Sequence, residues 1–370
     1  MMTHPTATAI LGAGMMGTAI AAAHLRRSLP IVLYDSAHTA LQTAPKRIVD
    51  ELRLQNESLQ DTLLTCTDNL DDILRCPVVI ETVSEKLRVK QKLYQKITAE
   101  RNPDGLLLSN TSTLSISLLA QHLRKEWQHR FCGFHFFHPV RQRSLVEIIA
   151  GKQTDSATLE AAKEHARRID KHFIVVGDSP GFLVNRILNP YLSSALSLLE
   201  QNVDLGRIDR TAVKFGMKMG PFQIMDEIGL DVVLHAGWVL HKAFPERTPQ
   251  SLILLRLIEQ GRLGRKSGQG FMLYTQQASW EGLGVPDPKF ASLDETISEE
   301  EILHRLFVPM YEEAVRCFEE GIIADLTMAD MASMEALGFP AERGGIVSWG
   351  RGMRYVNGSH IGLDVEQKVC

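Results

Sequence analysis

Short apolar runs alternate with amphipathic stretches along the first half of the chain. The runs predict strands, because they are rich in branched apolar residues and are bounded by Gly, Pro or polar turns. We expect strands at 7–11, 31–34, 78–82, 106–109, 131–137, 145–149 and 173–176. The stretch 85–100 predicts the clearest helix, since its apolar residues recur on one side. Strands that alternate with helices predict an α/β fold with a mostly parallel sheet, the Rossmann type.

The alternation ends at a turn, Gly-Asp-Ser-Pro at 177–180, and the chain then becomes helical without convincing strands. We therefore expect a first domain at 1–178 and an all-helical domain after it. A polar, Pro-containing stretch at 275–300 predicts a linker between two helical parts. These parts are the first helical copy, 179–276, and the linker with the second copy, 277–370.

The two helical parts resemble each other in sequence. Asn185-Arg186 before Pro190 is matched by His304-Arg305 before Pro309. The other matched pairs are Ala195 with Ala314, Glu200 with Glu319, Asp209 with Asp330, and Gly216 with Gly338. We interpret this as an internal duplication in which each copy buries its apolar face against the other. Chance similarity between amphipathic helices is the alternative.

A glycine fingerprint, Ile-Leu-Gly-Ala-Gly-Met-Met-Gly at 10–17, joins the first expected strand to an alanine-rich helix. The first glycine would make the turn, the second would admit a pyrophosphate, and the third would let helix and strand pack closely. The helix N-terminus would supply N–H groups to the anion. A glycine turn made for packing alone is the alternative. The candidate cofactor-binding residues here are Gly12, Gly14, Met15, Met16 and Gly17.

Asp35 ends the second expected strand, 18 residues past Gly17. A carboxylate at this position would accept hydrogen bonds from both ribose hydroxyls and would repel a 2′-phosphate. The pattern therefore predicts NAD rather than NADP.

Composition and charge exclude several classes of protein. The chain of 370 residues exceeds what one core usually holds, and its net charge of −4 gives no electrostatic case for nucleic acid or an anionic membrane. It has no run of about 20 apolar residues, as a membrane span would need. Its five cysteines form no CxxC pair or zinc-like grouping, which predicts free thiols in a reducing, cytoplasmic compartment and no metal site.

A histidine and a glutamate are placed for proton transfer on two expected strands. His135 and Glu147 lie toward facing ends of these strands. A histidine with a pKa near the ordinary value of about 6.5 can take a proton from an alcohol at neutral pH. Glu147 would fix the ring tautomer, and a carboxylate in an apolar strand itself needs a partner. Taken alone, His135 could equally be a core histidine whose hydrogen bonds are satisfied, which is the alternative interpretation.

With three further segments the fingerprint resembles the 3-hydroxyacyl-CoA dehydrogenase family. The segments are Ser-Asn-Thr-Ser at 109–112, HFFHPV with LVEII at 135–149, and DSPGFLVNR at 178–186. The resemblance implies that His135 is the catalytic base and Glu147 its partner. It also implies that Ser112 and Asn185 hydrogen-bond the reacting oxygen or the histidine. A helix cap is the alternative for Ser112, and a solvated helix residue for Asn185.

The same resemblance implies further contacts with NAD or with the pantetheine and phosphates of CoA. These residues are Asp35, Glu85, Lys90, Ser112, His138 and Lys266. A solvated helix face is the alternative for Glu85 and Lys90. The chain departs from the family where His138 replaces an Asn beside the nicotinamide and Arg143 replaces an apolar residue. The segment 46–61 also offers fewer cations than the lysine-rich segment that relatives present to CoA.

The implied function is NAD-dependent oxidation of an (S)-3-hydroxyacyl-CoA substrate to 3-ketoacyl-CoA by reversible hydride transfer. A dehydrogenase of a non-CoA hydroxy acid is one alternative. A non-catalytic NAD-binding protein, its site spoiled by His138 and Arg143, is another. The duplicated region resembles the dehydrogenase part of multifunctional fatty-acid oxidation enzymes, whose hydratase domain we do not expect in this chain. Single-copy relatives resemble dimers built through helical domains, so we expect a monomer through an internal pseudo-dimer, or a weak homodimer.

Overall fold

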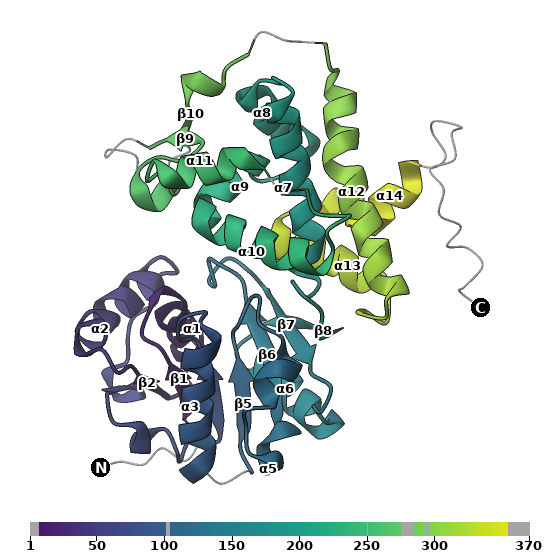
Figure 1. The fold of residues 1–370 in the computed structure, drawn as a ribbon. Coiled ribbons are helices and arrows are strands. Elements are labelled where there is room, and N and C mark those ends of the chain that lie inside the picture. The colour runs from purple at the N-terminus through teal and green to yellow at the C-terminus, as the bar shows by residue number, and fades with distance from the viewer. Residues whose placement is uncertain (1–6, 101–103, 250, 275–283, 293–295, 354–370) are drawn as a thin grey trace. The chain divides into compact units, whose positions relative to one another are not determined.

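The computed structural model describes residues 7–100, 104–249, 251–274, 284–292 and 296–353 (Figure 1). The chain divides into two compact units. The first holds the chain up to Asn185 together with Gly321–Ala324, and the second holds Arg186–Glu320 and the chain from Asp325 onward. The division falls inside helix α7 (Val184–Glu200).

The first unit is built on a sheet in which eight described strands follow the order β3-β2-β1-β4-β5-β6-β7-β8. Neighbouring strands are parallel, except that β7 runs antiparallel to β6. The order reverses between β1 and β4, and ligands of α/β proteins bind beyond the strand ends at such a switch point. The strands are β1 (Thr8–Leu11), β2 (Ile31–Tyr34), β3 (Leu64–Thr67), β4 (Val78–Glu81), β5 (Leu106–Ser109), β6 (Phe131–Phe136), β7 (Leu145–Ala150) and β8 (His172–Gly177).

The expected α/β fold of this unit is confirmed. All seven expected strands are present, and none of their ends moves by more than one residue. The sequence analysis missed β3, whose Thr65 and Cys66 are exposed and which shows no apolar run. The helices are α1 (Met15–Leu25), α2 (His38–Arg53), α3 (Leu87–Glu100), α4 (Ile116–Ala120), α5 (Lys125–Gln128) and α6 (Ser156–Arg168). The expected helix at 85–100 therefore begins two residues later.

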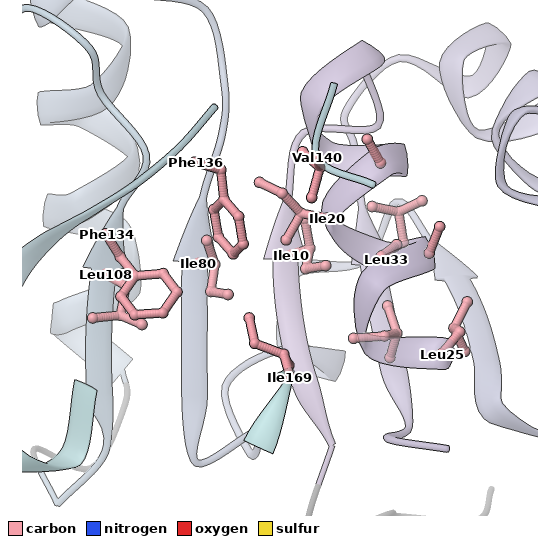
Figure 2. Packing of buried hydrophobic residues seen from close by; sticks show 14 of the residues in the cluster. Ile10, Ile20, Leu25, Leu33, Ile80, Leu108, Phe134, Phe136, Val140 and Ile169 are labelled. Carbon is pink, nitrogen blue, oxygen red and sulfur yellow. The ribbon is translucent and has the colours of Figure 1, made fainter. Parts of the chain in front are cut away.

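Side chains from strands and helices form one hydrophobic core around the middle of this sheet. Figure 2 shows this packing with Leu108, Ile80, Ile10 and Leu33 on four strands, Phe134 and Phe136 on β6, Ile20 and Leu25 on α1, and Val140 and Ile169 in connecting segments. The loops at the ends of the strands are thus held on a rigid support.

Two buried histidines, His24 on α1 and His165 on α6, face each other in this unit. Their Nε2 atoms are 2.9 Å apart, and Nδ1 of His24 lies 2.8 Å from the carbonyl oxygen of Ile20. His24 therefore carries its proton on Nδ1, and His165 donates to its Nε2. Burial lowers the pKa of His24 to about 4 and the pKa of His165 well below its ordinary value.

We expect acid to destabilise the protein through His24. Between pH 6.5 and 4 the unfolded chain binds a proton at His24 that the folded chain excludes, so the free energy of unfolding falls by about 3 kcal/mol across this window. Asp209 and Asp226 have pKa values raised by burial to about 7 and about 6, so they act in the opposite direction. Urea unfolding of the protein and of a His24→Gln variant at pH 7 and pH 5 separates the effect of His24 from that of the two aspartates. The same change in the free energy of unfolding between pH 7 and 5 in both proteins would contradict the assignment.

The second unit is helical, as expected, with one short two-stranded ribbon. Its helices are α7, α8 (Leu205–Phe215), α9 (Pro221–Ile228), α10 (Leu230–Ala243), α11 (Leu252–Glu259), α12 (Glu299–Glu319), α13 (Thr327–Ala332) and α14 (Ile346–Met353). The strands β9 (Met272–Leu273) and β10 (Val285–Pro286) correct the expectation of no further strands, since two residues are too few for an apolar pattern. Of the expected linker, 275–283 and 293–295 lie outside the described residues. None of the described helices combines the length and apolar character that a membrane span requires.

The same capping device occurs in both halves of this unit. Asp209 accepts hydrogen bonds from first-turn N–H groups of α9, and Asp330 accepts them from α14. A Cβ on Gly220 would lie 2.4 Å from Oδ1 of Asp209, and one on Gly345 would lie 2.5 Å from Oδ1 of Asp330. Any side chain at Gly220 or Gly345 would therefore clash with the capping aspartate that it contacts. These matched features support the internal duplication.

The two halves also share one aromatic core. Phe215 at the end of α8 stacks on Phe307 of α12 at 4.4 Å between ring centroids, and Tyr191 of α7 stacks on the same ring at 5.3 Å. Phe339 and Trp349 meet the Phe215 ring edge-on. The second copy therefore covers apolar side chains of the first.

Candidate active site

Close contacts require two of the three fingerprint glycines, and the third borders open space. Gly12 has a φ of 106°, and a Cβ there would lie 2.8 Å from the carbonyl oxygen of Thr82. A Cβ on Gly17 would lie 1.8 Å from the carbonyl oxygen of Gly12. A Cβ on Gly14 would meet no atom within 4 Å, so Gly14 borders open space.

This open space lies at the N-terminus of α1, which begins with Met15 and Met16. Gly14 is the N-cap residue, and no side chain caps the helix. The first-turn N–H groups have no acceptor within the helix and carry its positive dipole end. Open space beside unpaired donors fits a pyrophosphate.

Asp35 lies where the second strand ends, beside the glycine loop. Its Oδ2 accepts a hydrogen bond from the N–H of Ala13 at 2.7 Å, and its Oδ1 accepts one from Ala37 at 2.9 Å. Each carboxylate oxygen can accept a second hydrogen bond, which leaves capacity for ribose hydroxyls. Asp35 thus fixes the loop and keeps a negative charge next to it.

His135 and Glu147 are direct cross-strand partners in the antiparallel pair β6–β7. The side chain of Glu147 is 0% exposed, and its Oε2 lies 2.9 Å from Nδ1 of His135. Its Oε1 accepts hydrogen bonds from the N–H groups of Leu183 and Val184, both at 2.9 Å. With Glu147 ionised, Nδ1 carries the ring proton and Nε2 has a free lone pair. Glu147 therefore fixes the tautomer and the orientation of the His135 ring.

Ser112 and Asn185 meet this histidine from two further segments. Oγ of Ser112, in the loop after β5, lies 3.1 Å from Nε2 of His135. Nδ2 of Asn185, in the first turn of α7, donates to the carbonyl oxygen of Ser112 at 3.2 Å. The structure thus brings together all four residues that the resemblance implies for catalysis.

Glu85 organises the loop that carries Ser112. Its Oε1 accepts hydrogen bonds from the N–H groups of Ser112 and Thr113 and from the hydroxyl of Thr111. Burial raises the pKa of Glu85, but the Lys90 ammonium and the hydrogen bonds from Thr111 and Ser112 outweigh it, so the pKa is lowered. The carboxylate therefore stays charged and holds the loop.

Lys90 lies beneath this loop and not on a solvated helix face. Its side chain is 1% exposed, and Nζ lies 2.6 Å from Oε1 of Glu81 and 3.3 Å from Oε2 of Glu85. Glu81 also accepts from the hydroxyls of Tyr94 and Ser109. This placement gives Lys90 a supporting role and no free donor surface for a phosphate. Sequence reasoning missed Glu81, although a carboxylate in an apolar strand was the same signal that singled out Glu147.

Among the described hydrogen bonds, none joins the remaining implied contacts, His138 and Lys266, to the His135 group. His138 is exposed in the turn after β6. Arg143 lines a pocket of about 190 Å³ together with Arg26, Arg141 and Lys171. Lys266 lies in the helical unit, where its ammonium pairs with Asp231. The described residues contain no cluster of side chains that could hold a metal ion.

Comparisons with known proteins match both parts of the chain to one family. The model of the 3-hydroxyacyl-CoA dehydrogenase NAD-binding domain matches residues 7–179, and the model of the C-terminal domain of the same family matches 181–274. A solved (S)-3-hydroxybutyryl-CoA dehydrogenase of Ralstonia eutropha is 31% identical, with 73% of this chain and 99% of that chain covered and a TM-score of 0.67.

Two other solved structures extend into the second helical copy. The dehydrogenase part of multifunctional enzyme 1 from Caenorhabditis elegans is 25% identical, covering 90% of this chain and 78% of that chain at a TM-score of 0.63. The 3-hydroxybutyryl-CoA dehydrogenase of Escherichia coli shares the fold at 23% identity, covering 94% of this chain and 91% of that chain at a TM-score of 0.79. The chain therefore belongs to the 3-hydroxyacyl-CoA dehydrogenase family, with an NAD-binding unit and a helical unit.

Proposed function

We propose that this protein interconverts (S)-3-hydroxyacyl-CoA and 3-ketoacyl-CoA thioesters with NAD, as a step of the β-oxidation type. The observation that carries the proposal is the His135–Glu147 pair with Ser112 and Asn185 around it. This arrangement lies in the unit that bears the glycine loop, on the same sheet. The similarity to solved 3-hydroxybutyryl-CoA dehydrogenases supports a thioester of this class as substrate.

The residues divide the chemistry among themselves. Bound NAD⁺ supplies the hydride acceptor. Nε2 of His135 takes the proton of the C3 hydroxyl, and Glu147 stabilises the imidazolium that forms. The Ser112 hydroxyl donates a hydrogen bond to the reacting oxygen, and Asn185 holds the Ser112 segment in place. In the reverse direction the imidazolium returns its proton to the oxygen on C3.

An NADH-oxidation assay tests the proposal. We expect turnover with acetoacetyl-CoA and longer 3-ketoacyl-CoAs, and far less with the corresponding free acids. A preference for the free acids would favour a dehydrogenase of non-CoA hydroxy acids. Absence of turnover with every substrate, together with NADH binding, would leave a non-catalytic NAD-binding protein.

Asp35 is expected to set the choice of cofactor. Its carboxylate should make kcat/KM with NADH at least 100-fold higher than with NADPH, because one unfavourable charge contact costs about 3 kcal/mol. Asp35→Ser should lower the ratio of kcat/KM with NADH to kcat/KM with NADPH. Asp35→Asn should also lower this ratio, while it keeps the size of the side chain. Steady-state kinetics with both cofactors decide the matter. Equal use of NADPH by the unmodified protein would point instead to Arg47, whose guanidinium lies near the carbonyl oxygen of Ala13.

We further propose a cytoplasmic monomer in which the second helical copy takes the place of a partner subunit. The shared aromatic core of the two copies supports the monomer. Among the described residues, Cys66 and Cys132 are thiols outside any disulfide, which supports a reducing compartment.

A further inference from the structure

Arg186 directly follows Asn185 in the first turn of α7, and its side chain is 0% exposed. Its Nε donates to Oε1 of Glu313 at 2.8 Å, and a second nitrogen donates to the same oxygen. A third nitrogen donates to Oε2 of Glu320 at 2.6 Å. The guanidinium also lies over the ring of Phe244, 4.5 Å from its centroid. Glu313 lies in α12 and Glu320 is the C-cap residue of this helix, so both belong to the second helical copy.

A matched but weaker contact occurs at the equivalent positions of the duplication. Arg305 in the second copy corresponds to Arg186, and Gln201 in the first copy corresponds to Glu320. Arg305 donates to Oε1 of Gln201 at 3.0 Å on an exposed surface. Such reciprocal contacts are typical of a two-fold interface. Only the contact next to Asn185 is ionic and buried.

We propose that Glu313 and Glu320 are positioning residues for the dehydrogenase reaction, acting through Arg186 on Asn185. The inference rests on the proposed function, in which Asn185 holds the Ser112 segment. Glu147 binds the N–H groups of Leu183 and Val184 just before Asn185, and the Arg186 side chain is the anchor that follows it. The carboxylates of Glu313 and Glu320 bind the Arg186 guanidinium and so fix the start of α7. They thereby also fix the position of the Asn185 side-chain amide. The second copy thereby contributes to catalysis and does more than cover an apolar face.

A double-mutant cycle tests the proposal. Glu313→Gln keeps the side-chain shape and removes the charge, and we expect kcat to fall about tenfold while KM for NADH changes less than twofold. In an Asn185→Ala background the same substitution should change kcat by less than twofold, because the group that it positions is absent. Glu320→Gln, at a partly exposed position, should show the same pattern more weakly and remains usable if Glu313→Gln does not fold.

The matched control is Arg305→Ala, which removes the equivalent contact beside His304 and should leave kcat unchanged. Amide hydrogen exchange gives a second readout, with faster exchange at 184–187 expected in Glu313→Gln but not in Arg305→Ala. Equal losses of kcat in both Asn185 backgrounds, or unchanged exchange at 184–187, would overturn the proposal. An unmodified protein without dehydrogenase activity would refute the proposed function, and hydrogen exchange would still decide whether the glutamates fix the helix start.

Discussion

Replacing His135 with Gln is expected to lower turnover by a factor of about 10² to 10⁴, which is the usual contribution of a positioned general base. Gln can still donate to Oε2 of Glu147, so the carboxylate is not left without a partner in the apolar sheet. It cannot accept and return a proton at neutral pH. Binding of NADH should change little, because His135 lies on β6 and the glycine loop follows β1.

Steady-state kinetics with acetoacetyl-CoA and fluorescence titration with NADH measure these two effects separately. His122→Gln is the matched control, since the half-buried His122 is hydrogen-bonded to Gln91 and not to the His135 group, so this variant should retain full turnover. Near wild-type turnover in His135→Gln would remove this histidine from the mechanism. A large loss of NADH affinity would instead indicate that the substitution disturbs the fold.

The His135–Glu147 pair was predictable because strand register is a local property. Both residues lie in apolar strands close in sequence, and the antiparallel register places them opposite each other. The glycine loop was predictable for a similar reason, since a Cβ on Gly17 would clash with the carbonyl oxygen of Gly12, five residues earlier in the same strand–turn–helix unit. In both cases the residue types within a short segment are enough to predict how the segment folds.

The support of the Ser112 loop was not predictable in the same way. Lys90 lies at helical spacing from Leu87, Tyr94 and Ile97, on the buried side of α3, where the periodicity leads one to expect an apolar residue. It is buried because Glu81 and Glu85 neutralise it, and that pairing depends on how α3 packs on the sheet. The strand β3 escaped detection because an exposed edge strand needs no apolar residues. The ion pair between Arg186 and Glu313 joins residues 127 positions apart in the sequence, so no local pattern predicts it.

Removal of everything after Tyr274 is expected to convert the protein into a dimer or an insoluble chain. The truncation takes away Phe307, Phe339 and Trp349, which pack against Phe215. Tyr191 and Phe215 would become exposed, and aromatic side chains bury about 150–250 Å² each. An apolar patch of that extent on a monomer favours association. The truncation also removes both glutamates that bind the Arg186 guanidinium, which would leave a buried charge unpaired.

Light scattering at micromolar concentration measures the outcome. The full chain should scatter as a monomer of 41.3 kDa, and the truncated chain should either double its mass or precipitate. Adding residues 275–370 as a separate chain should restore solubility, because it supplies the missing apolar surface and the carboxylates of Glu313 and Glu320. A stable dimer of the full chain would show that the duplication serves another interface. A soluble and active truncated monomer would show that the first copy does not need the second, either for its core or for the position of Asn185.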